Sequence, residues 1–161
     1  METQGHLIVD LNRLDAAGEI YEGETSPDIM DIHDNEFVRS KGGIVYKLNI
    51  QALGTELLVR GTFSHMFVCR CSSCDKSFEL EVKENDFIES FEINEENAFP
   101  DLTNALREAI ILDLPAYPRC SESCKGLCGA CGCNLNDSEC KCNVDHGDDC
   151  WSALSALDSL E

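Results

Sequence analysis

Closely spaced cysteines near the C-terminus restrict what this chain can fold into more than any other feature of its sequence. The run Cys128-Gly129-Ala130-Cys131-Gly132 separates two thiols by two residues, and the final glycine lets the backbone turn back after them. Cys140 and Cys142 form a second pair after a polar turn. Structural zinc takes four tetrahedral ligands, and thiolates usually arrive as such pairs. The sequence therefore predicts a four-thiolate metal module, with zinc as its ion, within residues 120–142.

Two further cysteine pairs lie upstream of this module. Cys71 and Cys74 sit between two predicted strands, and Cys120 and Cys124 follow two prolines. The two pairs could meet in a second four-thiolate site that fixes the sheet to the cysteine-rich segment. A competing arrangement has one site only, in which Cys124 replaces Cys140 or Cys142. The other thiols are interpreted by default as small buried hydrophobic side chains, and these are Cys69, Cys133 and Cys150.

The cellular compartment decides how the 11 cysteines are used. The N-terminus lacks a basic start followed by an apolar run, so we expect no signal peptide and a reducing, cytoplasmic location. A redox-active dithiol usually begins at a helix N-terminus, whereas Cys71 follows a predicted strand. An iron–sulfur cluster would also accept four cysteines, but the chain offers none of the usual cluster-binding runs.

Net charge limits the classes of partner. The chain has 12 basic and 31 acidic residues and a formal net charge of −19. Binding to a phosphate backbone needs clustered Lys and Arg, and here they are scattered singly. The sequence therefore favours a basic protein partner over extended contacts with nucleic acid. No stretch approaches the roughly 20 apolar residues that a membrane span needs.

Alternating hydrophobic residues predict a sheet in the first part of the chain. Ile44, Tyr46, Leu48 and Ile50 alternate with other residues in the period of two that is typical of a half-buried strand. Short turns between neighbouring strands imply an antiparallel sheet or an open barrel. The predicted strands cover residues 6–11, about 19–22, 44–50, 57–63, 66–68, 78–82 and 87–93.

The hydrophobic period changes from two to that of a helix after residue 100. Leu102, Leu106 and Ile110 share one face of a predicted helix over about 101–113, with Asp101 as its N-cap. A second stripe predicts a C-terminal helix over about 148–160. We expect an α+β fold with an antiparallel sheet or open barrel, a covering helix, a Cys-rich zinc knuckle and this last helix. The expected domains are a sheet domain, 1–118, and a zinc-binding module, 119–161.

Catalytic residues are not evident in the sequence. The four histidines fall in unrelated settings, and no nucleophile–base arrangement can be defended from their order. A zinc ion with four thiolate ligands has no open position for water and would not catalyse hydrolysis. The sequence therefore predicts a protein that is not an enzyme and has no small-molecule substrate.

The cysteines belong to a longer pattern that resembles a known family. A strand ends at Cys71-x-x-Cys74, a helix opens at Asp101-Leu102, and Leu114-Pro115 precedes the run from Cys124 to Asn136, which reads Cys-Lys-Gly-Leu-Cys-x-x-Cys-Gly-x-Asn-Leu-Asn. From about residue 44 to the C-terminus this order resembles the large ribosomal RNA subunit accumulation proteins of bacteria and plastids, the YceD-like family. The chain departs from the family pattern at Ser73, Asp75, Gly129 and Cys133.

The resemblance implies a cellular role. Family membership implies a non-enzymatic factor for accumulation of large-subunit ribosomal RNA (rRNA), and hence for assembly of that subunit. The expected partners are large-subunit precursors, with basic ribosomal proteins as the main contacts. If rRNA is contacted directly, Arg119, Lys125 and Lys141 are the cations closest to the knuckle. The alternative is a thiol-redox or zinc-handling protein that uses the Cys-x-x-Cys pairs.

Overall fold

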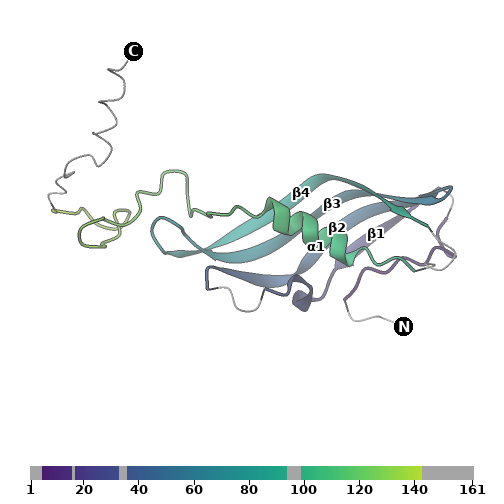
Figure 1. The fold of residues 1–161 in the computed structure, drawn as a ribbon, viewed down its shortest axis with the longest axis horizontal. Helices are drawn as coiled ribbons and strands as arrows, with labels where there is room; N and C mark the ends of the chain where they lie inside the picture. The colour runs from purple at the N-terminus through teal and green to yellow at the C-terminus, as the bar shows by residue number, and fades with distance from the viewer. Residues whose placement is uncertain (1–4, 16, 33–35, 94–98, 143–161) are drawn as a thin grey trace, which may run out of the picture. The chain divides into compact units, whose positions relative to one another are not determined.

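Four antiparallel strands and one covering helix are the main regular elements in the described part of the chain. A computed structural model describes residues 5–15, 17–32, 36–93 and 99–142. In chain order the elements are β1 (Glu19–Glu24), the short 3-10 helix η1 (Pro27–Met30), β2 (Val38–Leu53), β3 (Glu56–Arg70), β4 (Ser77–Glu92) and α1 (Thr103–Asp113) (Figure 1). The sheet has the order β1-β2-β3-β4, and each neighbouring pair is antiparallel. The predicted α+β class with an open antiparallel sheet is confirmed.

The chain divides into two compact units. The first, which contains the sheet and α1, comprises Met1–Ser72 and Lys76–Cys120. The second comprises Ser73–Asp75 and Ser121–Glu161. The predicted C-terminal helix over 148–160 lies outside the described residues, and so does Cys150. None of the helices in the described part of the chain is both long and apolar enough to cross a membrane.

The strands are fewer and longer than predicted. The separate strands expected at 57–63 and 66–68 are one strand, β3, and those expected at 78–82 and 87–93 are one strand, β4. Gly61 pairs with Phe87 whereas Phe63 pairs with Glu84, so β4 has one extra residue at this bulge. The extra residue reverses which alternate side chains face the core, and in the sequence this reversal looks like the end of a strand.

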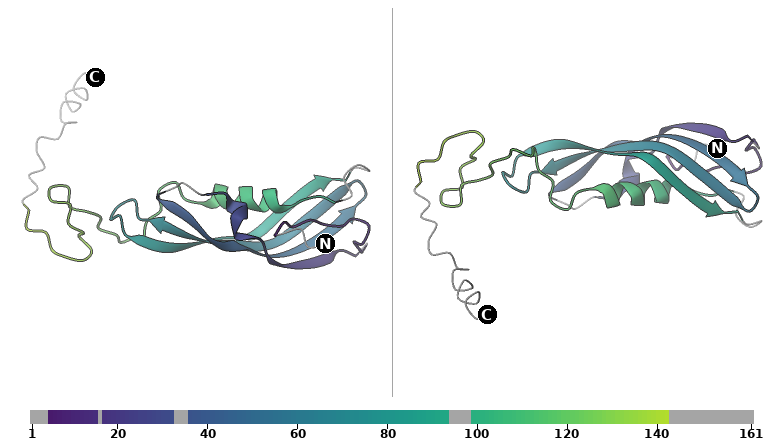
Figure 2. Two further views of the ribbon diagram at one scale, coloured as in Figure 1. Left: turned by 90° about the horizontal axis from the view of Figure 1, so that it is seen from below. Right: turned by 90° about the horizontal axis from the view of Figure 1, so that it is seen from above.

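One face of the sheet carries the core. The odd-numbered apolar residues of β3 are buried; α1 contacts β3 and β4, and η1 contacts β2. Figure 2 shows α1 lying along one face of the sheet. The alternation predicted for 44–50 is confirmed, since Ile44, Leu48 and Ile50 are buried. The remaining buried apolar side chains of this core are Leu7, Val9, Met30, Val38, Leu57, Val59, Phe63, Phe67, Cys69, Val82, Leu102, Leu106 and Ile110.

The N-terminal segment joins the start of α1. The strand predicted at 6–11 is wrong, because in this segment only Ile8 forms a bridge, with Asp101. The backbone N–H of Val9 donates to the Pro100 carbonyl at 3.0 Å, and that of Leu102 donates to the Leu7 carbonyl at 2.9 Å. The partner segment, residues 100–102, leads directly into α1, so the backbone pairing with the N-terminal segment cannot continue. Leu7 and Val9 are nevertheless buried.

The start of α1 differs by one residue from the prediction. Leu102, not Asp101, occupies the N-cap position. The Asp101 carboxylate still accepts a hydrogen bond from the Thr103 backbone N–H at 2.9 Å, so it satisfies a free donor of the first turn. Burial raises the pKa of Asp101, but hydrogen bonds from Thr103 and His6 outweigh it and hold the pKa below its usual range.

A buried polar cluster links β3 to β2 at a bulge in β2. The β2–β3 register shifts between Lys41 and Val45. The Nδ1–H of buried His65 donates to the Gly43 carbonyl at 3.0 Å, since a carbonyl can only accept. The ring's Nε2 therefore accepts from the Ser40 hydroxyl at 2.9 Å. Burial lowers the pKa of His65, which favours this neutral form.

Candidate metal centres

Eight cysteines gather into two groups of four. The first group is Cys71, Cys74, Cys120 and Cys124, and the second is Cys128, Cys131, Cys140 and Cys142. Within each group all four sulfur atoms lie within 4.8 Å of one another. These are the eight residues that the sequence pattern singled out, in the arrangement with two sites. Metal ligation by them stays a prediction.

The sulfur separations match a tetrahedral ion. With Zn–S bonds of about 2.3 Å, a regular tetrahedron puts its sulfurs about 3.8 Å apart. The Sγ atoms of Cys131 and Cys140 are 3.7 Å apart, and those of Cys140 and Cys128 are 3.3 Å apart. A disulfide would need about 2.05 Å, and all ten described cysteines are free thiols. The donor set therefore fits a metal ion that is bound tetrahedrally by four thiolates. Zinc and iron are the metals that such a set favours.

A tight turn positions the first two ligands of the second group. Cys128 accepts at its carbonyl from the Gly132 backbone N–H at 2.9 Å, and its own N–H donates to the Cys133 carbonyl at 2.8 Å. Gly132 has a φ of 72°, the left-handed conformation that an L side chain rarely adopts. The chain thus folds back directly after Cys131, as the glycine in the sequence predicts.

Backbone N–H groups favour thiolates at Cys128 and Cys131 of the second group, whereas hydrogen bonds with Cys140 and Cys131 raise the pKa of Cys142 to about 12. The Ala130 N–H lies 3.4 Å from the Cys128 sulfur, and the Cys142 N–H lies 3.3 Å from the Cys140 sulfur. A hydrogen bond from the Cys133 backbone, followed by contacts with neighbouring thiols, lowers the pKa of Cys131 to about 6. Backbone N–H groups, with Cys131 first and then Ala130, also lower the pKa of Cys128. A metal cation binds deprotonated thiolate ligands, and N–H donors of this kind stabilise the thiolate form.

The first group is more buried than the second. Cys71, Cys74 and Cys124 are buried and Cys120 is partly buried, whereas Cys131 and Cys142 are exposed. In the sheet unit the Cys120 N–H donates to the Cys71 sulfur at 3.4 Å. Cys71 directly follows β3, which ends at Arg70. Because Cys71 follows a strand, it does not lie at a helix N-terminus, the position that lowers the pKa of a redox-active thiol.

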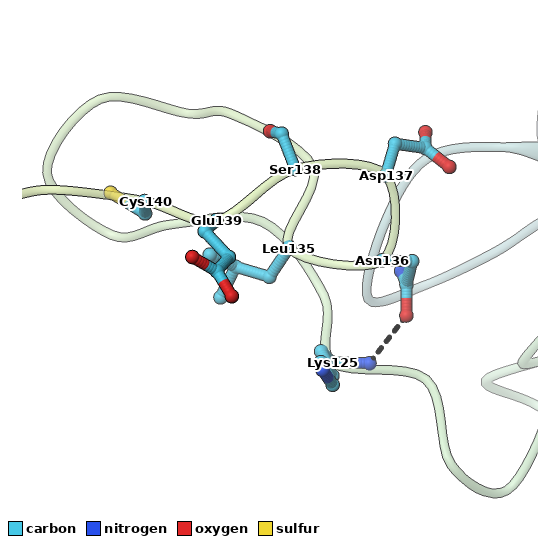
Figure 3. A pocket seen from close by; sticks show the side chains of 7 residues that line it. All are labelled: Lys125, Leu135, Asn136, Asp137, Ser138, Glu139 and Cys140. Atoms are coloured by element: carbon cyan, nitrogen blue, oxygen red, sulfur yellow. Dashed lines mark hydrogen bonds between the residues drawn. The ribbon is translucent and has the colours of Figure 1, made fainter.

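One residue that supports the cysteines was missed by sequence reasoning. The Asn136 amide donates to the Cys124 sulfur at 3.4 Å, and its Oδ1 accepts from the Lys125 backbone N–H at 2.8 Å. Figure 3 shows this second hydrogen bond beside an open pocket of about 500 Å³ lined by Asp137 and Glu139. The Asn134-Leu135-Asn136 run was the available signal, since it formed part of the family resemblance.

The remaining thiols behave differently from one another. Cys69 is fully buried, and burial raises its pKa, so its predicted role as a small core side chain is confirmed. The same prediction is wrong for Cys133, which is only partly buried. Its thiol contacts Cys131 and Cys140, and the hydrogen bond to Cys131 together with burial raises the pKa of Cys133 to about 12. Cys133 lies among turns beside the second cysteine group and not in the sheet core, so its side chain is only partly covered.

Comparison with known proteins adds the family. The model of the family described as "Large ribosomal RNA subunit accumulation protein YceD" matches residues 75–158, slightly more than half of the chain. The chain belongs to the YceD family. The match contains the whole second cysteine group together with Cys120 and Cys124, and it begins directly after Cys74. Members of the YceD family are therefore the proteins with which this cysteine pattern should be compared.

An Arabidopsis thaliana protein, "Large ribosomal RNA subunit accumulation protein YCED homolog 1, chloroplastic", is 32% identical over 57 residues. That alignment covers 35% of this YceD-family chain and only 18% of the Arabidopsis protein. The chain thus corresponds to a small part of that relative's length. No solved structure matches the chain significantly.

Proposed function

We propose that this YceD-family chain is a non-enzymatic factor that supports the accumulation of large-subunit rRNA and the assembly of the large ribosomal subunit. The observation that carries the proposal is the family match over residues 75–158, a family named for large ribosomal RNA subunit accumulation. Its proposed working parts are a sheet domain, residues 1–118, and a cysteine-rich module, residues 119–161. The Arabidopsis relative is named as chloroplastic, whereas for this chain we propose the cytoplasm.

Structural zinc is the second part of the proposal. Each four-cysteine group would hold one zinc ion through its thiolates, and four filled positions leave none for a reacting water. The described part of the second unit is almost entirely turns and short bridges, so it has little apolar surface to bury. Metal binding would supply folding free energy that such a segment cannot obtain from burial.

The acidic edge of the sheet supports a basic protein partner. β4 is an edge strand, and its side chains include Glu79, Glu81, Glu84, Asp86, Glu89 and Glu92 against Lys83 as its one cation. An edge strand presents unpaired backbone groups, and a field of carboxylates attracts positive segments. Basic ribosomal proteins are therefore the contacts that we propose for this edge.

Co-sedimentation in the chain's own host tests the proposed role. Tagged protein should be enriched on large-subunit precursors at low salt, and depletion should lower the level of large-subunit rRNA. A chain absent from all ribosomal particles, with unchanged rRNA on depletion, would refute the role. In that event the thiol-redox or zinc-handling alternative is tested next, by thiol titration of Cys71 and Cys74 with and without metal loss.

A further inference from the structure

An open pocket at one end of the sheet combines aromatic rings with a guanidinium group. It has a volume of about 410 Å³ and is lined by Phe37, Val38, Arg70, Ser72, Tyr117 and Pro118, among others. The Arg70 backbone N–H donates to the Phe37 carbonyl at 2.7 Å, and that of Ser72 donates to the Pro118 carbonyl at 2.8 Å. These bonds join the three segments that form the pocket, all within the sheet unit.

The rings in this pocket are exposed. Tyr117 is 81% exposed and Phe37 is 60% exposed, and the Arg70 guanidinium lies 6.0 Å from the centre of the Phe37 ring. This distance is at the outer limit of a cation–π contact. The two aromatic rings and the guanidinium group together form a surface on which a flat, electron-rich group can stack. Exposed aromatic rings of this kind occur at binding sites more than elsewhere on a protein surface.

The local charge around the pocket is opposite to that of the whole chain. The three segments that form it, residues 36–41, 68–72 and 116–120, hold four basic residues and one acidic residue. The basic residues are Arg39, Arg70, Arg119 and Lys41, of which Lys41 forms an ion pair with Glu79 of β4. No carboxylate lines the pocket, whereas the pocket beside Lys125 is lined by Asp137 and Glu139. In a chain with a net charge of −19, this end of the sheet is suited to an anion.

We propose that this pocket binds an unpaired nucleotide of large-subunit rRNA. The base stacks on the exposed faces of Phe37 and Tyr117, and the phosphates lie towards Arg70 and the neighbouring Arg39. Base–aromatic stacking and stacking on a guanidinium plane are the usual means by which single-stranded RNA is held. One such pocket needs no extended basic surface, so it is compatible with the acidic character of the remaining chain.

The proposal rests on the proposed function, because it names the RNA contact of the same assembly factor. It also separates the two kinds of partner. The acidic edge of β4 suits a basic protein, whereas a basic segment would be repelled from the pocket around Arg70. An acidic protein segment is the competing occupant for the pocket, and the experiment below distinguishes it from RNA.

Fluorescence anisotropy with the full chain tests the pocket. The probe is a fluorescein-labelled, single-stranded RNA of ten nucleotides of mixed sequence, at low salt. Losing one stacking ring should weaken binding about 5- to 160-fold, the loss expected for one base–aromatic contact. Tyr117→Ala and Phe37→Ala are therefore the test variants. Arg70→Gln should also weaken binding. The matched controls are Leu112→Ala, which removes an apolar side chain that is 83% exposed, and Lys47→Gln in the middle of β2, and both should change the affinity less than twofold.

The outcomes separate the pocket from the wider role. Weak binding that is equal in the wild type, Tyr117→Ala and Phe37→Ala would overturn the pocket, and so would tighter binding of an acidic peptide than of RNA. Circular dichroism of each variant shows whether it folds, and Tyr117 is exposed enough for its truncation to leave the fold intact. A wild-type chain that sediments with large-subunit precursors but does not bind the RNA probe would refute the pocket alone. A chain absent from the particles would refute the proposed function whatever the RNA result.

Discussion

Gly43 occupies a position at which the sheet has no room for a side chain. A Cβ atom at this residue would lie 1.9 Å from the Thr25 carbonyl oxygen and 2.8 Å from its carbonyl carbon. Both atoms belong to the backbone, so β2 or the segment after β1 would have to move. The Gly43→Ala substitution should therefore destabilise the sheet unit, although it adds one methyl group only.

The size of the effect follows from what surrounds Gly43. The Thr25 N–H donates to the Ile44 carbonyl at 3.0 Å, and His65 donates to the Gly43 carbonyl at 3.0 Å. Each of these two hydrogen bonds contributes about 0.5–1.5 kcal/mol, and overpacking costs about 1–3 kcal/mol. The lower entropy of the unfolded Ala variant offsets about 0.4–1 kcal/mol of this. The expected loss is about 3 kcal/mol, or roughly 10 °C in Tm.

Urea unfolding of the full chain, followed by far-ultraviolet circular dichroism, measures this loss. Gly23→Ala in β1 is the matched control, because its added Cβ would meet the hydroxyl end of the Tyr46 side chain at 2.9 Å. That flexible side chain can move away, so the control should lose less than about 1 kcal/mol. Equal stability of the Gly43→Ala chain and the wild type, or equal losses in the two variants, would refute the reasoning.

Two further predictions concern the buried histidine and the cysteine groups. Because burial lowers the pKa of His65, the unfolded chain takes up the His65 proton first as the pH falls. The stability that this group contributes is fully present above about pH 6.5 and declines below it. The urea midpoint should therefore fall more between pH 7.5 and pH 5.5 in the wild type than in His65→Gln. Equal falls in the two chains would contradict this. The proposal of one zinc ion in each cysteine group predicts that Cys124→Ser and Cys140→Ser each lose one of two zinc ions in elemental analysis after dialysis. Cys69→Ala, which lies outside both groups, should keep both. Loss of all zinc from either variant would instead favour a single shared site.

The local parts of the fold could be predicted from the sequence. Alternation in residues 44–50 gave the buried face of β2, and the recurrence of Leu102, Leu106 and Ile110 gave the buried face of α1. The grouping of Cys128 with Cys131 depends on a turn of a few residues, and the glycine that makes the turn is visible in the sequence. Each of these features is determined by neighbours within a few positions.

The features that were missed depend on distant partners. The bulge opposite Gly61 shifts the phase of β4, and only the pairing with β3 shows that the strand continues. The Ile8–Asp101 bridge joins residues 93 positions apart, so no local pattern could show that the N-terminal segment pairs only once. Tyr117 and Phe37 likewise lie far apart in the sequence, and neither has a local signal for the pocket that they share.

The order of the sheet has a consequence for synthesis of the chain. Because β1, β2, β3 and β4 are neighbours in the same order in which they are translated, each hairpin can pair as soon as its second strand leaves the ribosome. The apolar face then stays uncovered until α1 has been made and the N-terminal segment has closed onto Pro100 and Leu102. A nascent chain stalled after β4 would therefore expose a complete sheet with an open hydrophobic side, and this is the stage at which chaperone capture or aggregation should be greatest.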